Sequence, residues 1–207
     1  MLVAGLDEAG RGPVLGPLVV GCVIFEETDL HLLEEWGIDD SKRLSHTRRV
    51  ELATKIKENC VKWDIFTITP QRINVLHYKK RLSLNQIEEM HFAHILNNIS
   101  PKPHQIFLDA CDTIEDRFGK SISQKLNFVP SQIVSKHKGD SIFKIVGASS
   151  IIAKLERDQI LTTYKKKYGN CGSGYPSDKY TREFLRNYYN KFQKFPPITR
   201  TWWKTAI

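Results

Sequence analysis

The sequence has few of the features that mark membrane, secreted or metal-thiolate proteins. Its most apolar run, residues 14–25, has 12 residues and contains Pro17, whereas a membrane-spanning helix needs about 20 apolar residues. Acidic residues follow the first six residues directly, so we expect no signal peptide. The four cysteines form no Cys-x-x-Cys pair, which argues against a zinc or redox motif and favours reduced thiols in a cytoplasmic protein.

Basic residues, in contrast, are in excess. The 207 residues include 31 Lys and Arg against 23 Asp and Glu, a formal net charge of +8 at pH 7. This length fits one domain with a proper core, and 41% hydrophobic residues are typical of an ordinary globular protein. The positive charge indicates a polyanionic partner, either nucleic acid or an anionic membrane surface, without choosing between them.

Hydrophobic periodicity predicts alternating strands and helices. We expect strands at residues 3–7, 18–25, 63–68, 106–108 and 128–134. We expect helices after Ser45, over 84–95, within 142–168 and over 181–192. This alternation favours an α/β domain with a mixed sheet. The region after Gly169 is the one candidate for a small separate lobe.

Acidic side chains end two of the expected strands. Asp7, followed by Glu8, ends the first strand, and Asp109 ends the strand at 106–108. If these strands are neighbours, the two carboxylates face each other across about 5 Å of backbone spacing. Two ionised carboxylates at that separation repel unless one is protonated or a cation lies between them. Oxygen ligands of this kind favour Mg²⁺ or Mn²⁺ over zinc.

A glycine-rich turn follows the first acids. Gly10 and Gly12 allow backbone N–H groups to approach a ligand, and Arg11 between them supplies a charged donor. Carboxylates for a metal beside donors for a phosphate make a coherent phosphodiester site. The alternative interpretation is a solvated strand end turned by glycines.

Two other patterns carry less weight. Glu88, His91 and His94 have a spacing that places metal ligands on one helix turn, but an apolar stripe runs through the same positions. Packed or surface histidines are therefore the favoured interpretation. Trp202 and Trp203 near the C-terminus are expected to dock the tail onto the core rather than to stack on bases.

Five ordered blocks of the sequence resemble the type 2 ribonucleases H, the ribonuclease HII family. Arginine between the two glycines resembles this family rather than the related HIII enzymes, and the tyrosine block and the C-terminus resemble archaeal and eukaryotic members. The blocks are residues 7–13 (Asp-Glu-Ala-Gly-Arg-Gly-Pro), 40–44 (Asp-Ser-Lys-Arg-Leu), 108–110 (Leu-Asp-Ala), 138–158 (beginning Lys-Gly-Asp-Ser and containing Gly-Ala-Ser-Ser-Ile-Ile-Ala-Lys) and 172–178 (Gly-Ser-Gly-Tyr-Pro-Ser-Asp).

The resemblance implies a fold and a reaction. The fold would be ribonuclease H-like, with a five-stranded mixed sheet flanked by helices and a small helical C-terminal portion. The reaction would be metal-dependent endonucleolytic hydrolysis of the RNA strand of RNA–DNA hybrids, including incision 5′ of a single ribonucleotide embedded in duplex DNA. It would leave 5′-phosphate and 3′-hydroxyl ends.

The resemblance also implies roles for individual residues. The metal-binding and catalytic acids would be Asp7, Glu8, Asp109 and Asp140, which would hold two Mg²⁺ or Mn²⁺ ions. Asp7 would bridge the ions, and Asp140 would hold the more weakly occupied one. Asp140 also lies in a polar Lys-Gly-Asp-Ser turn, where a capping role is the alternative.

A second group of residues matches substrate recognition in the family. Gly10, Arg11, Gly12 and Tyr175 would sense the ribonucleotide, whose 2′-hydroxyl distinguishes RNA from DNA. The basic residues Lys42, Lys154 and Arg157 are candidates for phosphate contacts, with solvated charges as the alternative for each.

These interpretations define an organisation and its rivals. We expect a ribonuclease H-like catalytic domain at residues 1–168 and a helical substrate-recognition extension, not an independent domain, at 169–207. The protein would be a monomer that binds hybrids and ribonucleotide-containing DNA and no membrane. A sliding clamp is a possible partner, although residues 193–203 contain no clean clamp-binding peptide. The rivals are a basic hybrid-binding module without cleavage and an HIII-like enzyme restricted to longer hybrids.

Overall fold

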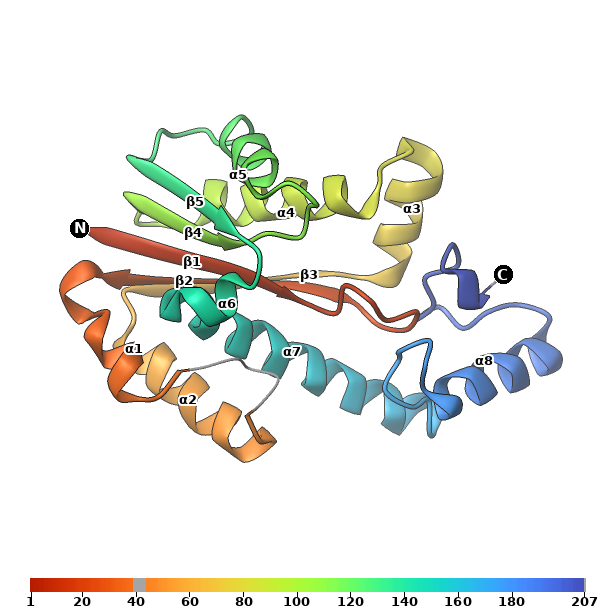
Figure 1. Ribbon diagram of the computed structural model, residues 1–207. Helices are drawn as coiled ribbons and strands as arrows, with labels where there is room; N and C mark the ends of the chain where they lie inside the picture. Colours follow the sequence, from red (N-terminus) through yellow and green to blue (C-terminus); the bar gives the residue numbers. More distant parts are fainter. Residues whose placement is uncertain (39–43, 207) are drawn as a thin grey trace. The chain divides into compact units, whose positions relative to one another are not determined.

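A five-stranded mixed sheet forms the centre of the computed structural model, which describes residues 1–38 and 44–206 (Figure 1). The strand order is β3-β2-β1-β4-β5. The inner strands β1 and β4 are parallel, as are β4 and β5. The strands are β1 (Leu2–Ala9), β2 (Leu18–Glu26), β3 (Lys62–Ile68), β4 (Gln105–Asp109) and β5 (Gln132–Lys136).

Helices cover both faces of the sheet. In Figure 1, α4 and α5 lie on one face, and α1, α2 and the first part of α7 lie on the other. The helices are α1 (His31–Glu35), α2 (His46–Asn59), α3 (Pro70–Lys80), α4 (Leu84–Asn98), α5 (Glu115–Ser123), α6 (Gly139–Ile142), α7 (Lys144–Tyr168) and α8 (Lys179–Phe192), with short 3₁₀ turns at Glu27–Asp29 and Lys204–Ala206. None of these helices combines the length and the apolar character that a membrane crossing requires.

Local sequence signals explain most of these boundaries. Ser45 caps α2 as predicted, because its hydroxyl accepts from the Arg48 N–H at 3.2 Å. The strand expected at residues 128–134 is confirmed but begins later, at Gln132. The helix α3 is not among the helices expected from the sequence, because Pro70 lies just after β3 and a proline at that place is typical of a strand end. Proline also begins helices, and here Thr69 caps the helix that Pro70 starts.

The described chain divides into two compact units. Unit 1 comprises Met1–Ala9, Val20–Phe66 and Leu84–Leu155, and unit 2 comprises Gly10–Val19, Thr67–Ser83 and Glu156–Ile207. The expected organisation, a catalytic domain at 1–168 with a recognition extension at 169–207, stays a prediction.

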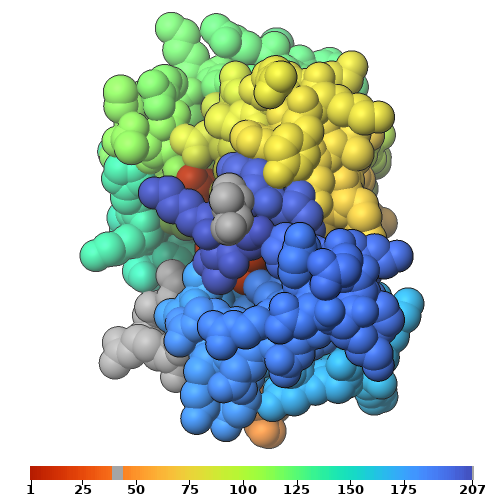
Figure 2. Space-filling model, turned by 90° about the vertical axis from the view of Figure 1, so that its right-hand side faces the viewer, coloured from red at the N-terminus to blue at the C-terminus, as the bar shows by residue number. Residues whose placement is uncertain are grey.

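Each unit has its own apolar cluster. In unit 1, side chains of β1 and β2 pack against α1, α2 and the N-terminal half of α7, with Phe25, Ile56 and Ile151 fully buried. In unit 2, Val14, Leu15 and Ile198 pack with Leu185 of α8. Figure 2 shows α3, in yellow, beside the dark blue C-terminal segment, where the Asn74 side-chain amide donates to the Thr199 carbonyl at 2.9 Å.

Candidate active site

The parallel pairing of β1 with β4 brings three acids of unit 1 together. Leu6 pairs with Leu108, and Asp7 and Asp109 follow these residues at the same ends of the two strands. The potential ligand oxygens of Asp7, Glu8 and Asp109 lie within 4.8 Å of one another. The two strands are neighbours, so the condition under which Asp7 and Asp109 were expected to meet is fulfilled.

The short helix α6 brings Asp140 to the same side of unit 1. Gly139 packs directly on β4, since a Cβ at this residue would lie 2.8 Å from the Leu108 carbonyl oxygen. Its N–H donates to Oδ1 of Asp109 at 2.6 Å. The next residue, Asp140, is buried in the first turn of α6, and its charge acts on Asp7. We call Asp7, Glu8, Asp109 and Asp140 the acid cluster.

The surroundings of Asp7 disfavour its charge. Burial raises the pKa of its carboxyl group well above the ordinary value, and the negative charges of Glu8, Asp109 and Asp140 raise it further. A hydrogen bond with the Ser150 side chain acts in the opposite direction. A bound cation would relieve both the burial and the repulsion, so this donor set of carboxylate oxygens suits a hard divalent ion.

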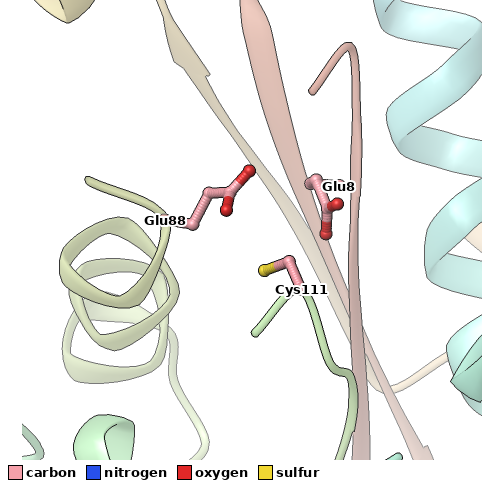
Figure 3. A group of neighbouring side chains, drawn as sticks. All are labelled: Glu8, Glu88 and Cys111. Atoms are coloured by element: carbon pink, nitrogen blue, oxygen red, sulfur yellow. The ribbon is translucent and has the colours of Figure 1, made fainter. Parts of the chain in front are cut away.

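Glu8 also faces a second pair of side chains that sequence reasoning did not connect with it. Glu88 extends from α4 and Cys111 lies two residues after β4, and the potential ligand atoms of all three residues lie within 4.8 Å of one another (Figure 3). Glu88 is fully buried. Glu88 and Cys111 therefore place a further potential oxygen ligand and a potential sulfur ligand beside Glu8.

The histidines near Glu88 pack as predicted instead of joining a metal cluster. His91 and His94 contact the Phe66 ring at centroid distances of 5.2 Å and 4.7 Å. Neither belongs to a potential metal-ligand group among the residues that the structure describes. Phe66 thus explains their positions by packing.

The glycine turn, residues 10–12, lies in unit 2 beside the loop that carries Tyr175. The Val14 N–H donates to the Gly174 carbonyl at 2.8 Å, and the Leu15 N–H donates to the same oxygen at 3.1 Å. The Tyr175 ring lies against the turn, since a Cβ at Gly12 would be 3.5 Å from its Cε1. The predicted grouping of Gly10, Gly12 and Tyr175 is therefore present within this unit.

Arg157 lies beneath this group. Only 4% of the residue is exposed, and its guanidinium carbon is 5.7 Å from the centre of the Tyr175 ring. A Cβ at Gly10 would lie 2.5 Å from Arg157 Nε, and Gly10 also has a φ of +94°. Glycine is required here both by its backbone conformation and by this close approach. Burial lowers the pKa of Arg157.

The remaining candidate residues lie on α7, in the C-terminal segment or outside the described residues. Lys154 is half-buried on α7 in unit 1, whereas Lys42 lies outside the described residues. Trp203 packs into the apolar cluster of unit 2, which confirms the expected docking of the C-terminal segment. Arg200, to which no role was assigned from the sequence, is fully buried and donates to carbonyls of the glycine turn.

Comparison with known proteins decides the family. The sequence profile of Ribonuclease HII matches residues 4–206. The chain belongs to the ribonuclease HII family. Ribonuclease HII from Thermococcus kodakarensis is 44% identical over 205 residues, which cover 99% of this chain and 88% of that protein.

Solved structures agree with this membership. The crystal structure of ribonuclease H2 from Pyrococcus horikoshii OT3 matches with a TM-score of 0.93 at 40% identity, covering 100% of this chain and 95% of that one. The PCNA:RNase HII complex from Archaeoglobus fulgidus matches with a TM-score of 0.87 at 34% identity, covering 99% and 96%.

Family membership confirms the predicted fold and class of reaction. The chain has the ribonuclease H-like fold of its structural neighbours. It is a hydrolytic endoribonuclease that acts on the RNA strand of RNA–DNA hybrids. The choice that the net charge left open, between nucleic acid and a membrane surface, is thereby made in favour of nucleic acid.

Proposed function

We propose that the protein also incises duplex DNA on the 5′ side of a single embedded ribonucleotide, leaving 5′-phosphate and 3′-hydroxyl ends. Such an activity belongs to DNA replication and repair. The observation that carries the proposal is the joint arrangement of the glycine turn and Tyr175, which hydrogen bonds from Val14 and Leu15 to the Gly174 carbonyl hold together.

This arrangement suits the recognition of one ribose. Backbone N–H groups of the glycine turn can approach a 2′-hydroxyl because no Cβ intervenes at Gly10 or Gly12. Tyr175 is 42% exposed, so its ring is available to stack on the sugar or base of the next nucleotide. A deoxynucleotide fits that position better, which explains a preference for the step from RNA into DNA.

The acid cluster supports a site for two divalent ions, Mg²⁺ or Mn²⁺. Asp7, Glu8, Asp109 and Asp140 offer carboxylate oxygens, the ligands that both ions prefer. The raised pKa of Asp7, caused by burial and by neighbouring negative charge, is the signature of carboxylates gathered for a cation. Bound ions of this kind supply activation of water and relief of charge at the scissile phosphate.

The chain's own residues position and hold the substrate. Ser150 orients Asp7 through its hydrogen bond, and Gly139 orients Asp109 through its N–H. Lys154 is proposed to contact a phosphate. Arg157 is proposed to attract the phosphate backbone, and its burial beneath Tyr175 gives it the second task of supporting that ring.

A sliding clamp is a further proposed partner. The relative from Archaeoglobus fulgidus was solved as a complex with PCNA. Residues 193–203 of this chain contain no clean clamp-binding peptide, so we expect any clamp contact to use a diverged sequence. We expect the enzyme to act as a monomer.

The test is cleavage of a duplex with one ribonucleotide, mapped at single-nucleotide resolution with Mg²⁺, with Mn²⁺ and with chelator. We expect metal-dependent incision on the 5′ side of the ribonucleotide. Asp7→Asn should reduce the rate at least 100-fold, since it removes a ligand charge, whereas the exposed control Asp116→Asn should retain it.

The two rivals predict other outcomes. Hybrid binding without cleavage would support a binding module. Cleavage of a continuous hybrid without incision at the single ribonucleotide would support an HIII-like specificity. Equal incision by Asp7→Asn would show that the acid cluster is not the catalytic site, and any of these three results would refute the proposal.

A further inference from the structure

Arg200 is fully buried, and its guanidinium donates hydrogen bonds to three backbone carbonyls of the segment Gly10–Gly16. Its Nε donates to the Gly16 carbonyl at 3.0 Å, its Nη1 to the Arg11 carbonyl at 3.0 Å and its Nη2 to the Gly10 carbonyl at 2.6 Å. One planar guanidinium thus gathers three carbonyls, a geometry that the single ammonium of lysine cannot reproduce.

Trp203 completes this arrangement. Its ring centre lies 4.9 Å from the Arg200 guanidinium carbon, and its Nε1–H donates to the Gly12 carbonyl at 3.0 Å. The three successive carbonyls of Gly10, Arg11 and Gly12 are therefore all held by side chains of the C-terminal segment.

Holding the carbonyls also sets the direction of the N–H groups. The peptide bonds of this turn are trans, so each N–H points opposite to the carbonyl of the same peptide unit. The partners of the Gly10 and Arg11 carbonyls are the N–H groups of Arg11 and Gly12, which consequently point away from Arg200. The residue after Gly12 is Pro13, which has no N–H. Two adjacent donors thus point to the same side of the turn, away from Arg200, an arrangement that binds electronegative atoms.

We propose that Arg200 and Trp203 are positioning residues for ribonucleotide specificity: they hold the glycine turn so that the N–H groups of Arg11 and Gly12 donate to the 2′-oxygen of the ribose. This inference rests on the proposed single-ribonucleotide activity and adds residues outside the Gly-Arg-Gly motif to its specificity. Neither residue touches the substrate in this role.

A positioning role differs from a purely structural role in its effect on specificity. Loss of either side chain should weaken the contact with the 2′-hydroxyl, and not only lower the overall rate of cleavage. A substrate with 2′-fluorine tests this, because fluorine is a weak acceptor of similar size and the 2′ group is not the nucleophile in hydrolysis by water. The measured quantity is the ratio of kcat/KM for the 2′-hydroxyl duplex to kcat/KM for the 2′-fluoro duplex.

We expect Trp203→Phe and Arg200→Lys each to reduce this ratio about 5- to 10-fold, the effect of about one hydrogen bond. Trp203→Phe keeps an aromatic ring beside Arg200 and removes only the N–H donor, so it carries the test if Arg200→Lys does not fold. Trp63→Phe and Arg186→Lys, both exposed and distant in sequence, are the matched controls and should leave the ratio unchanged.

The outcomes are separable. A folded Trp203→Phe enzyme that loses activity equally on both duplexes would overturn the positioning role and leave the proposed function intact. A wild-type enzyme that fails to cut the 2′-hydroxyl duplex would overturn the proposed function, and the inference with it. A reduced ratio in Trp203→Phe, with unchanged ratios in both controls, supports the inference.

Discussion

At the scale of single residues, the acid cluster depends on side chains that are not themselves acids. Asp7 is buried among negative charges that raise its pKa, whereas a hydrogen bond with the Ser150 side chain lowers it. A hydrogen bond to the ionised form favours that form. Ser150 therefore helps to keep Asp7 ready for a cation, because a protonated carboxyl group competes with metal binding.

Ser150→Ala should weaken metal binding more than catalysis at saturating metal. We expect the Mg²⁺ concentration for half-maximal hybrid cleavage to rise about tenfold, as for other residues that orient metal ligands. Activity titrated against Mg²⁺ measures the effect, and the exposed Ser123→Ala is the control. An unchanged titration curve for Ser150→Ala would contradict this role.

At the scale of elements, an ion pair between the buried Asp112 and the exposed Arg117 fastens the segment between β4 and α5. Asp112 is 4% exposed and accepts from Arg117 Nε at 2.6 Å and from the Thr113 N–H at 2.6 Å. These contacts, the hydrogen bond from Arg117 first, lower the pKa of Asp112 to about 2. The pair anchors the chain just after Asp109, so it supports the acid cluster through the backbone.

Asp112→Asn should remove a stabilisation of the fold that depends on pH. The folded pKa lies below the unfolded value of about 3.9, so the stabilisation is present above pH 4 and is lost as the pH falls toward 2. We expect the variant to be less stable by about 1–2 kcal/mol at pH 7, since the exposure of Arg117 limits the strength of the pair, and to approach the stability of wild type as the pH falls to 2.

Urea unfolding of both proteins between pH 2 and pH 7 measures the difference. Asp116→Asn on the exposed side of α5 controls for the loss of a negative charge at the helix N-terminus. A difference that stays constant over this pH range would exclude the ion pair as its cause.

At the scale of the whole molecule, the net charge of +8 and the acid cluster have opposite effects on nucleic acid. Basic side chains attract phosphates by releasing counterions, which makes binding weaken as salt is added. The acid cluster repels a phosphate until cations neutralise it. Attraction is thus a property of the whole surface, whereas cleavage depends on the few carboxylates of the acid cluster.

The salt dependence of binding should identify the basic residues that contact phosphate. With Asp7→Asn as background to prevent cleavage, hybrid affinity should fall linearly with salt on logarithmic axes, and Lys154→Gln should reduce the slope by about 1. The exposed Lys120→Gln on α5 should leave the slope unchanged. Equal slopes for Lys154→Gln and its background would place Lys154 outside the phosphate contacts.

The sequence alone determined the features that depend on residues close to one another along the chain. Ser45 predicted the start of α2, and short apolar runs predicted the strands, because caps and periodicity act within a few residues. The acids at the ends of two strands, with the Gly-Arg-Gly turn, indicated a phosphodiester site, and the resemblance of five ordered blocks to the ribonuclease HII family predicted the metal-dependent nuclease. The sequence placed Asp7 beside Asp109 only on the condition that their strands are neighbours.

Tertiary structure decided which distant residues complete these groups. The parallel register of β1 and β4 met the condition for Asp7 and Asp109, and packing brought Ser150, Glu88 and Cys111 to the acids. Arg200 reaches the Gly16 carbonyl across 184 positions of sequence. Hydrogen bonds across such separations have no local signal, because they form only when the chain between the partners has packed.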